Sequence, residues 1–438
     1  MRKQVRAGDL GARLMIDPAL REDPFPCYQQ LRDQARIVRG GIALTSAHHD
    51  VCLAVLRSPD FGCGLRFDRL PGPLRLAMKV GGRPVLGPTE PPSMLAVDPP
   101  DHTRYRKLVT RAFSTRAVAA LRSRVEEIAE ELLDEIAGSV TATRPATRSA
   151  TRSDERSDEA DATVDLVARY GSLLPVTVIA EMLGAPVAMR RQFLEWGAGA
   201  SLSLDVGLSY RDFCRAEHNL AALHRWTVRH FAQIRHTPRD DILSTLVTAN
   251  REDGQLSADE LSSIAMLLLA AGFETTVNLL GTGATLLMHH PDQLDLLRAQ
   301  PQLWPNAVEE ILRYDSPVQR TGRLARRDTE VAGLRVRAGS FIILLLGGAN
   351  RDPAVFPEPD RFDIRRAEAG EHLAFSSGVH YCLGAALARV EGEVGLPALF
   401  RRFPDLALAG PPHRRPNRVL RGYDSIPVRM ASLTPTGT

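Results

Sequence analysis

The amino-acid sequence predicts a mainly helical protein of the α+β class, with a small β component. Apolar residues recur at three- and four-residue spacing through most of the chain, as they do in amphipathic helices. Short strand patterns with glycine turns occupy only a few segments. The chain shows neither regular strand–helix alternation nor a glycine-rich phosphate loop, so a built-in nucleotide-binding domain is not expected.

A short strand pattern near residues 42–46 comes first, and helical patterns follow it. The spacing of apolar residues predicts helices over 117–138, 173–197 and 239–248. The second of these is interrupted by Gly-Ala-Pro at 184–186, which favours a break.

The longest helical pattern lies between Ser257 and Pro291. Ser257 and Glu260 form a capping box at its start, and the proline marks its end. About 32 residues at ~1.5 Å each give roughly 48 Å of helix, enough to cross a whole domain. Residues 264–273 are apolar nearly all round, so this helix is expected to be buried.

Two further strand regions and one insert complete the pattern. Residues 329–348 contain short strands with glycine turns, and 422–430 adds another strand segment. The segment 139–163 repeats arginine every four residues and has almost no large apolar side chains, so we expect a disordered surface loop. A functional basic arm is the alternative, but acidic residues nearly cancel these arginines.

The composition excludes several classes of protein. The chain has 438 residues, of which 44% are hydrophobic and 24% charged, and this is a globular profile. A net charge of +3 gives no reason to expect a nucleic-acid partner. The first residues lack an apolar core, and the longest apolar runs are too short to span a bilayer. We therefore expect a cytoplasmic protein without a membrane anchor.

The five cysteines are scattered, odd in number and contain no CxxC pair, which argues against a disulfide framework or a cysteine-based zinc site. Four of them are expected to be small buried hydrophobes. Cys382 differs, because it lies in the pattern F-x-x-G-x-H-x-C-x-G directly before a predicted helix. Backbone N–H groups at a helix start favour a thiolate, and Gly378 and Gly384 let the backbone approach a large flat group.

The stretch FSSGVHYCLGAALAR resembles the haem-ligand loop of the cytochrome P450 family. Serine stands at position 376, where the family most often has glycine. Other matches follow in family order over nearly the entire chain, apart from the 139–163 insert, and are closest to the soluble bacterial members. They are DPPDHTRYR at 98–106, AAGFETT at 270–276, EEILR at 309–313, RLARRD at 323–328 and NRDPAVFPEPDRF at 350–362.

The resemblance implies one cytochrome P450 domain over residues 1–438, with haem b between the long central helix and the cysteine loop. Cys382 matches the thiolate ligand of the haem iron, and Glu274 with Thr275 matches the acid and alcohol that deliver protons to O₂. Residues matching other cofactor-binding positions, four of them cationic partners of the haem propionates, are His102, Arg106, Gly272, Arg323, Phe375, His380 and Gly384. A structural ion-pair network is expected from Glu310, Arg313 and Arg361.

The implied reaction inserts one atom of O₂ into a lipophilic small molecule, by hydroxylation or epoxidation. Electrons would come from a ferredoxin and its NAD(P)H-dependent reductase, and the protein is expected to be a monomer. A basic docking surface for the ferredoxin is expected from Arg326, Arg327, Arg389, Arg401 and Arg402. Substrate contacts are expected in residues 70–97, 198–235, 267–271 and 318–319. The alternatives are a haem-thiolate sensor without turnover and a peroxide-driven enzyme.

Overall fold

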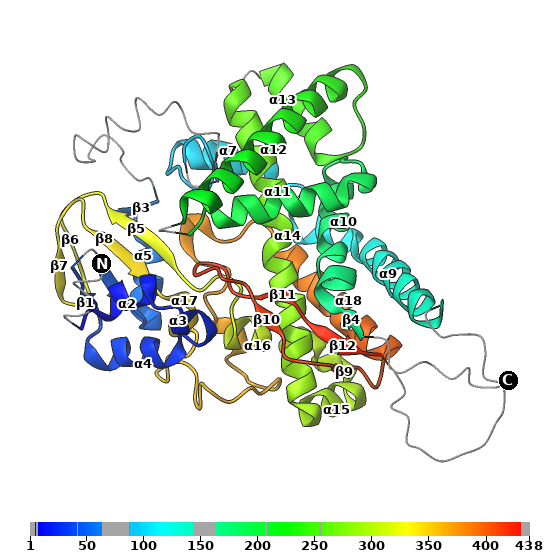
Figure 1. Ribbon diagram of the computed structural model, residues 1–438. Coiled ribbons are helices and arrows are strands. Elements are labelled where there is room, and N and C mark those ends of the chain that lie inside the picture. Colours follow the sequence, from blue (N-terminus) through cyan, green and yellow to red (C-terminus); the bar gives the residue numbers. More distant parts are fainter. Residues whose placement is uncertain are drawn as a thin grey trace, which may run out of the picture.

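The computed structural model describes residues 5, 8–41, 43–63, 87–88, 90–142, 163–205, 208–253 and 256–430 (Figure 1). Helices dominate them, and the longest, α14 (Ala258–His289), runs through the middle of the molecule. Before α14 come α2 (Leu10–Ile16), α3 (Ala19–Glu22), α4 (Phe25–Gln34), α5 (His49–Arg57), α7 (Asp101–Val109), α8 (Thr115–Ala120), α9 (Arg122–Ala142), α10 (Leu173–Met182), α11 (Arg190–Leu202), α12 (Tyr210–His236) and α13 (Ile242–Asp253). After it come α15 (Pro291–Ala299), α16 (Trp304–Tyr314), α17 (Leu346–Ala349) and α18 (Ala385–Arg402).

Helix α14 confirms the predicted long buried helix. Its capping box is present: the Ser257 hydroxyl accepts from the Glu260 N–H at 3.2 Å, and the Glu260 carboxylate accepts from the Ser257 N–H at 2.7 Å. Pro291 does not lie in α14 but opens the next helix, α15. By length and composition α14 could cross a membrane, but 72% of its most apolar window is buried inside the protein, as in a core helix.

The other predicted helices differ in their bounds. The segment 117–138 is two helices, because α8 ends before Leu121 and α9 begins after it. The expected break near 184–186 is confirmed, with Gly184 at φ +67° between α10 and α11. Helix α13 confirms the prediction at 239–248 but begins three residues later. The 27-residue α12 was predicted only as part of a variable substrate-contacting stretch.

The largest sheet has five strands in the order β1-β2-β8-β5-β3. Strand β8 (Phe341–Leu344) pairs antiparallel with β5 (Thr321–Ala325) and parallel with β2 (Leu44–Ser46). The predicted strands at 42–46, 329–348 and 422–430 are therefore confirmed. The remaining strands are β1 (Val38–Arg39), β3 (Phe61–Gly62), β4 (Thr163–Asp165), β6 (Thr329–Val331), β7 (Leu334–Val336), β9 (Ala407–Leu408), β10 (His413–Arg414), β11 (Tyr423–Ser425) and β12 (Pro427–Arg429).

The predicted insert at 139–163 begins and ends differently from the expectation. Helix α9 continues to Ala142, and β4 begins at Thr163. Residues 143–162 lie outside the described residues.

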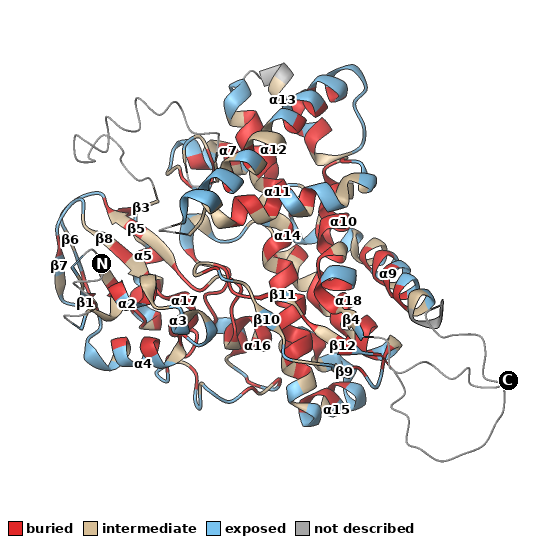
Figure 2. Cartoon of the chain, in the orientation of Figure 1, coloured by how far each residue is buried: buried red, intermediate tan, exposed pale blue. Residues whose placement is uncertain are grey.

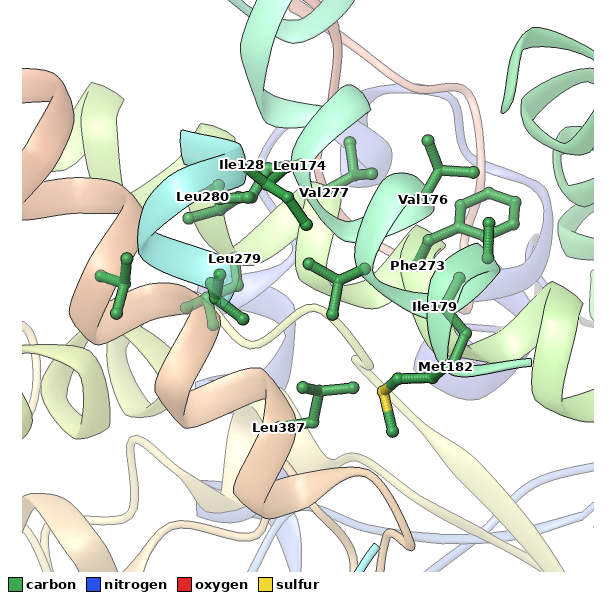
Figure 3. Packing of buried hydrophobic residues seen from close by; sticks show 14 of the residues in the cluster. Ile128, Leu174, Val176, Ile179, Met182, Phe273, Val277, Leu279, Leu280 and Leu387 are labelled. Atoms are coloured by element: carbon green, nitrogen blue, oxygen red, sulfur yellow. The ribbon is translucent and has the colours of Figure 1, made fainter. Parts of the chain in front are cut away.

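The main hydrophobic core surrounds α14 (Figure 2). Side chains of α9, α10, α14 and α18 meet there, among them Ile128, Leu174, Phe273 and Leu387 (Figure 3). Each is at most 3% exposed, and burying such a side chain stabilises the fold by ~1.5–3 kcal/mol. This core fixes α18, and with it the loop that carries Cys382, against the central helix.

Candidate functional site

The Cys382 loop is closed by its own backbone. The Cys382 N–H donates to the carbonyl oxygen of Phe375 at 2.9 Å, and α18 begins three residues after the cysteine. Gly378 has φ +68°, and a Cβ there would lie 2.3 Å from the carbonyl oxygen of Leu56, so only glycine fits. Ser376 also has a positive φ, +61°, at the position where the family usually has glycine. These contacts fix the backbone conformation of the loop and therefore the position of the thiol.

The Cys382 side chain retains accessible surface, while the protein around it disfavours the charged form. Desolvation raises the pKa of the thiol, and the Gly384 N–H and the guanidinium groups of Arg106 and Arg389 oppose that rise. Gly384 thus acts through its backbone N–H at the start of α18. A metal ion bound to the sulfur would displace the proton, because coordinating thiols are deprotonated.

Helix α7 brings two predicted residues to this loop from about 280 positions away in the sequence. The rings of His102 and His380 lie 4.3 Å apart, and Arg106 Nη1 donates to the carbonyl oxygen of Val379 at 3.3 Å. Burial lowers the pKa of His102 to about 4, helped by the positive charges of His380 and Arg106. The His102 ring is therefore neutral near pH 7.

His380 belongs to a cluster of possible metal ligands that the sequence did not reveal. Ligand atoms of Cys63, Asp98 and His380 all lie within 4.8 Å of one another, and His380 Nε2 is 3.7 Å from Asp98 Oδ1. Burial raises the pKa of the Cys63 thiol to about 11, which disfavours it as a metal ligand. Arg323, on β5, donates to Thr321 Oγ1 at 3.0 Å and to the Gly322 carbonyl at 2.8 Å.

Helix α14 presents one accessible face. Leu267, Ala271 and Thr275 follow one another at four-residue spacing and keep accessible surface, whereas most of α14 is buried. The Thr275 hydroxyl donates to the Ala271 carbonyl at 3.4 Å. Gly272 lies on the face of α14 that packs against α10, since a Cβ added there would be 3.1 Å from Ile179. Close packing of α10 on α14 is therefore the reason for this glycine.

Glu274 is 3% exposed and ion-paired with Arg415, which follows β10. Burial raises the pKa of Glu274, and Arg415 opposes that rise. Arg415 Nε lies 3.4 Å from a carboxylate oxygen of the exposed Asp424. The sequence carried no signal for this partner, because 141 residues separate Arg415 from Glu274.

The predicted ion pair of α16 is present, but its predicted third member is wrong. Arg313 donates to both carboxylate oxygens of Glu310 at 2.6 and 2.8 Å, and both residues are fully buried. The third member is Arg366, whose Nε lies 3.3 Å from Glu310. Arg361 contributes only its carbonyl oxygen, since its side chain is 56% exposed and faces Glu358 and Asp363.

The predicted basic docking surface is largely neutralised. Arg389 Nη2 donates to a carboxylate oxygen of Glu309 at 3.0 Å, and its guanidinium carbon lies 4.6 Å from the centre of the Phe375 ring. Arg327, Arg401 and Arg402 are paired with Asp60, Glu130 and Asp134. Each of these four arginines therefore shares its charge with a carboxylate that the sequence pattern did not indicate.

The residues around Cys382 fit a haem. A thiol lies at a helix start with a backbone donor on its sulfur, and Phe375 shields one side of the loop. Within the described part of the chain, Arg106 and Arg323 have no carboxylate partner, although Arg323 is only 5% exposed. Unpaired cations of this kind suit the carboxylates of a bound group. Cys382 would hold the iron, and Arg106 and Arg323 would face the propionates.

Comparisons with known proteins show the family of the chain. The sequence pattern that defines the family "Cytochrome P450" matches residues 209–417. The chain is 47% identical to a putative cytochrome P450 140 of Mycobacterium tuberculosis, over 97% of this chain and 93% of that relative. It is 43% identical to the 6-deoxyerythronolide B hydroxylase of Saccharopolyspora erythraea, over 76% of each chain.

A solved structure is also similar. The myxobacterial cytochrome P450 CYP267B1 in complex with myristic acid superposes with a TM-score of 0.82 at 33% identity, covering 96% of this chain and 99% of that one. This likeness and the near full-length identity to the curated relatives leave one assignment. The chain belongs to the cytochrome P450 family of haem-dependent monooxygenases.

Proposed function

We propose that this protein inserts one atom of O₂ into a lipophilic small molecule, by hydroxylation or epoxidation, as a cytoplasmic monomer. One observation carries the proposal: α7 and the Cys382 loop bring a thiol, His102, Arg106 and His380 together from distant parts of the chain. When bound there, haem b supplies the activation of O₂ and the transfer of its oxygen atom.

The chain's own residues then hold the cofactor and control protons. Cys382 binds the iron, and the Gly384 N–H on its sulfur tunes that bond. Glu274 precedes Thr275 on α14 and is the acid that delivers protons toward the Thr275 hydroxyl, while the ion pair with Arg415 holds the Glu274 side chain in place. Burial raises the pKa of Glu274, which favours the protonated form from which it can donate.

The substrate lies against the accessible face of α14. Leu267 and Ala271 are apolar, which favours a lipophilic ligand. A relative that is a 6-deoxyerythronolide B hydroxylase and a solved relative with myristic acid support the same class. Electrons come from a ferredoxin, which is reduced by its NAD(P)H-dependent reductase. The ferredoxin docks over Val379 and Tyr381, two exposed hydrophobic side chains beside Cys382.

Turnover with isotopically labelled oxygen tests the proposal. Substrates are first selected as ligands that shift the spin state of the ferric haem. With a surrogate ferredoxin pair and ¹⁸O₂, we expect one labelled atom in the product. Cys382→Ala should lose both the product and the red-shifted Soret band of the reduced, carbon-monoxide-bound protein. Product formation that needs peroxide but neither reductant nor O₂ would instead identify a peroxide-driven enzyme.

A further inference from the structure

A small cavity is lined by residues of the N-terminal helices and of the β10–β11 hairpin. Leu20 and Arg21 line it from α3, Gln319 and Arg320 from the segment before β5, and residues 414–422 from the hairpin. Its volume is about 20 Å³, and ~10–15 Å³ already admits a water molecule. None of the residues assigned above to the haem lines it.

The lining of this cavity is strongly basic. Its six arginines, which we call the arginine pocket, are Arg21, Arg320, Arg414, Arg415, Arg418 and Arg421. Four carboxylates face the group. Asp315 pairs with Arg414 at 3.1 Å and with Arg421 at 2.7 Å, and Arg415 pairs with Glu274 and Asp424. Asp205 accepts hydrogen bonds from the backbone N–H groups of residues 418 and 419.

Three arginines of the pocket therefore have no carboxylate within ion-pair distance in the described part of the chain: Arg21, Arg320 and Arg418. Arg320 donates to the Arg418 carbonyl at 3.1 Å and is 8% exposed. Concentrated positive charge of this kind is costly to keep together away from water.

Several guanidinium groups of the pocket also have unused hydrogen-bond donors. Arg21 Nε, Arg414 Nη1 and Arg418 Nε are buried and have no hydrogen-bond partner within the described ranges. Arg421 shows that the same surroundings can give every guanidinium nitrogen a partner, because its three nitrogens donate to Asp315 and to the carbonyl oxygens of Arg21 and Glu22. Desolvation and the nearby charge of Arg21 lower the pKa of Arg418. The three unused donors all belong to residues that line one cavity.

We propose that the arginine pocket binds a small oxyanion of the carboxylate type. A carboxylate is planar and accepts several hydrogen bonds from guanidinium groups, and its oxygens would take the place of water in the cavity as the arginine side chains adjust around it. Its source is either a free carboxylate or the acid end of an amphipathic substrate. The second source is compatible with position, because Arg415 joins the pocket to Glu274 on α14, and Gln319 belongs to a segment expected to contact substrate.

Isothermal titration of the haem-loaded protein at constant ionic strength tests the site, with acetate, dodecanoate and methyl dodecanoate as probes. We expect both carboxylates to bind, and Arg418→Gln and Arg21→Gln to weaken their binding at least about tenfold through loss of a charged donor. Both substitutions keep the backbone contacts of residues 418 and 21. Arg13→Gln is the matched control, because Arg13 lies on α2, pairs with Asp17 and does not line the cavity.

Each outcome decides between stated alternatives. Dodecanoate binding more tightly than acetate, with the ester much weaker, identifies the acid end of a substrate as the source. Equal affinities for acetate and dodecanoate identify a free carboxylate. Ester binding equal to that of the acid, or carboxylate binding unaffected by both pocket substitutions, overturns the site, as does an absence of carboxylate binding. The titration needs no turnover, so its result is independent of the oxygen-labelling test of the proposed function.

Discussion

Two regions of the molecule bury glutamates in contrasting surroundings. On α16, Glu310 accepts from Arg313, from Arg366 and from the backbone N–H of Asp363. On α14, Glu274 has one arginine, and on α18 both carboxylate oxygens of Glu391 lack a hydrogen-bond partner among the described residues. The first region is saturated with hydrogen bonds, and the second leaves buried polar groups unsatisfied.

We expect this difference to separate a role in stability from the role in chemistry that we propose for Glu274. A buried ion pair with every donor and acceptor used holds its loops in one arrangement. Buried carboxyl groups without enough partners have shifted pKa values. A shifted pKa of this kind is useful for proton transfer but does not stabilise the fold. Among the described residues, buried polar groups near Cys382 and on the helices around α14 therefore lack the partners that such groups usually have, as is common at functional sites.

Breaking the saturated region should have the largest effect on folding. Arg313→Gln leaves Glu310 with Arg366 and the backbone N–H of Asp363, and removes donors from the carbonyl oxygens of Asn350 and Pro359. Breaking a buried pair costs ~3–5 kcal/mol, so we expect a loss of this size in the free energy of unfolding, measured in urea, and poor haem incorporation. Arg361→Gln is the control and should change stability by less than ~0.5 kcal/mol. Equal effects of the two substitutions would contradict the Arg366 assignment.

Substitution on the accessible face of α14 should affect chemistry and spare the fold. Thr275→Ala removes a hydroxyl whose only hydrogen bond in the part of the chain that the structure describes is the 3.4 Å contact to Ala271, so stability should change little. Product formed per NAD(P)H consumed should fall by up to ~10²–10⁴-fold, with peroxide released instead, because ordered proton transfer is lost. Thr275→Ser keeps the hydroxyl and should stay coupled. Unchanged coupling in the alanine variant would remove Thr275 from the proton path.

The unsatisfied carboxyl of Glu391 should make stability depend on pH. Burial raises its pKa to about 8 from an ordinary value of 4.5. Between these values the folded state keeps a proton that the unfolded state has lost, so stability falls as pH rises, by up to ~1.4 kcal/mol per pH unit. Glu391→Gln should match wild type near pH 5 and exceed it near pH 8 in urea unfolding. Glu393→Gln on the same helix is the control, and parallel pH curves for wild type and Glu391→Gln would refute the shift.

The smallest expected effect concerns the backbone of the Cys382 loop. Ser376 has φ +61°, and its buried hydroxyl has no hydrogen-bond partner among the residues described here. A left-handed conformation costs a residue with a side chain ~1–2 kcal/mol, so Ser376→Gly should raise the free energy of unfolding by about 1 kcal/mol. Ser377→Gly should lower it, because the Ser377 hydroxyl accepts from Arg57 at 3.0 Å and its φ of −155° suits any residue. A loss of stability in Ser376→Gly would show that the serine is favoured in this loop.

Local patterns in the sequence were good predictors where one short segment contains the whole signal. The capping box at Ser257 and Glu260 predicted the start of α14, and the glycine at 184 predicted the break between α10 and α11. The break at Leu121 was missed, because the helical periodicity continues across it. The wrong choice of Arg361 over Arg366 has a similar cause, since two arginines five residues apart are equivalent until the chain turns one of them inward.

By itself, the sequence determined the class of fold, the long central helix and the thiol loop, because helix periodicity, capping and a dense motif act over a few neighbouring residues. Only the tertiary structure decided which distant charges meet. Arg415 reaches Glu274 across 141 positions, His102 meets His380, and six arginines from three segments surround one cavity. Pairings of this kind depend on how helices and hairpins pack, and no local pattern encodes the distance between two side chains that packing alone brings together.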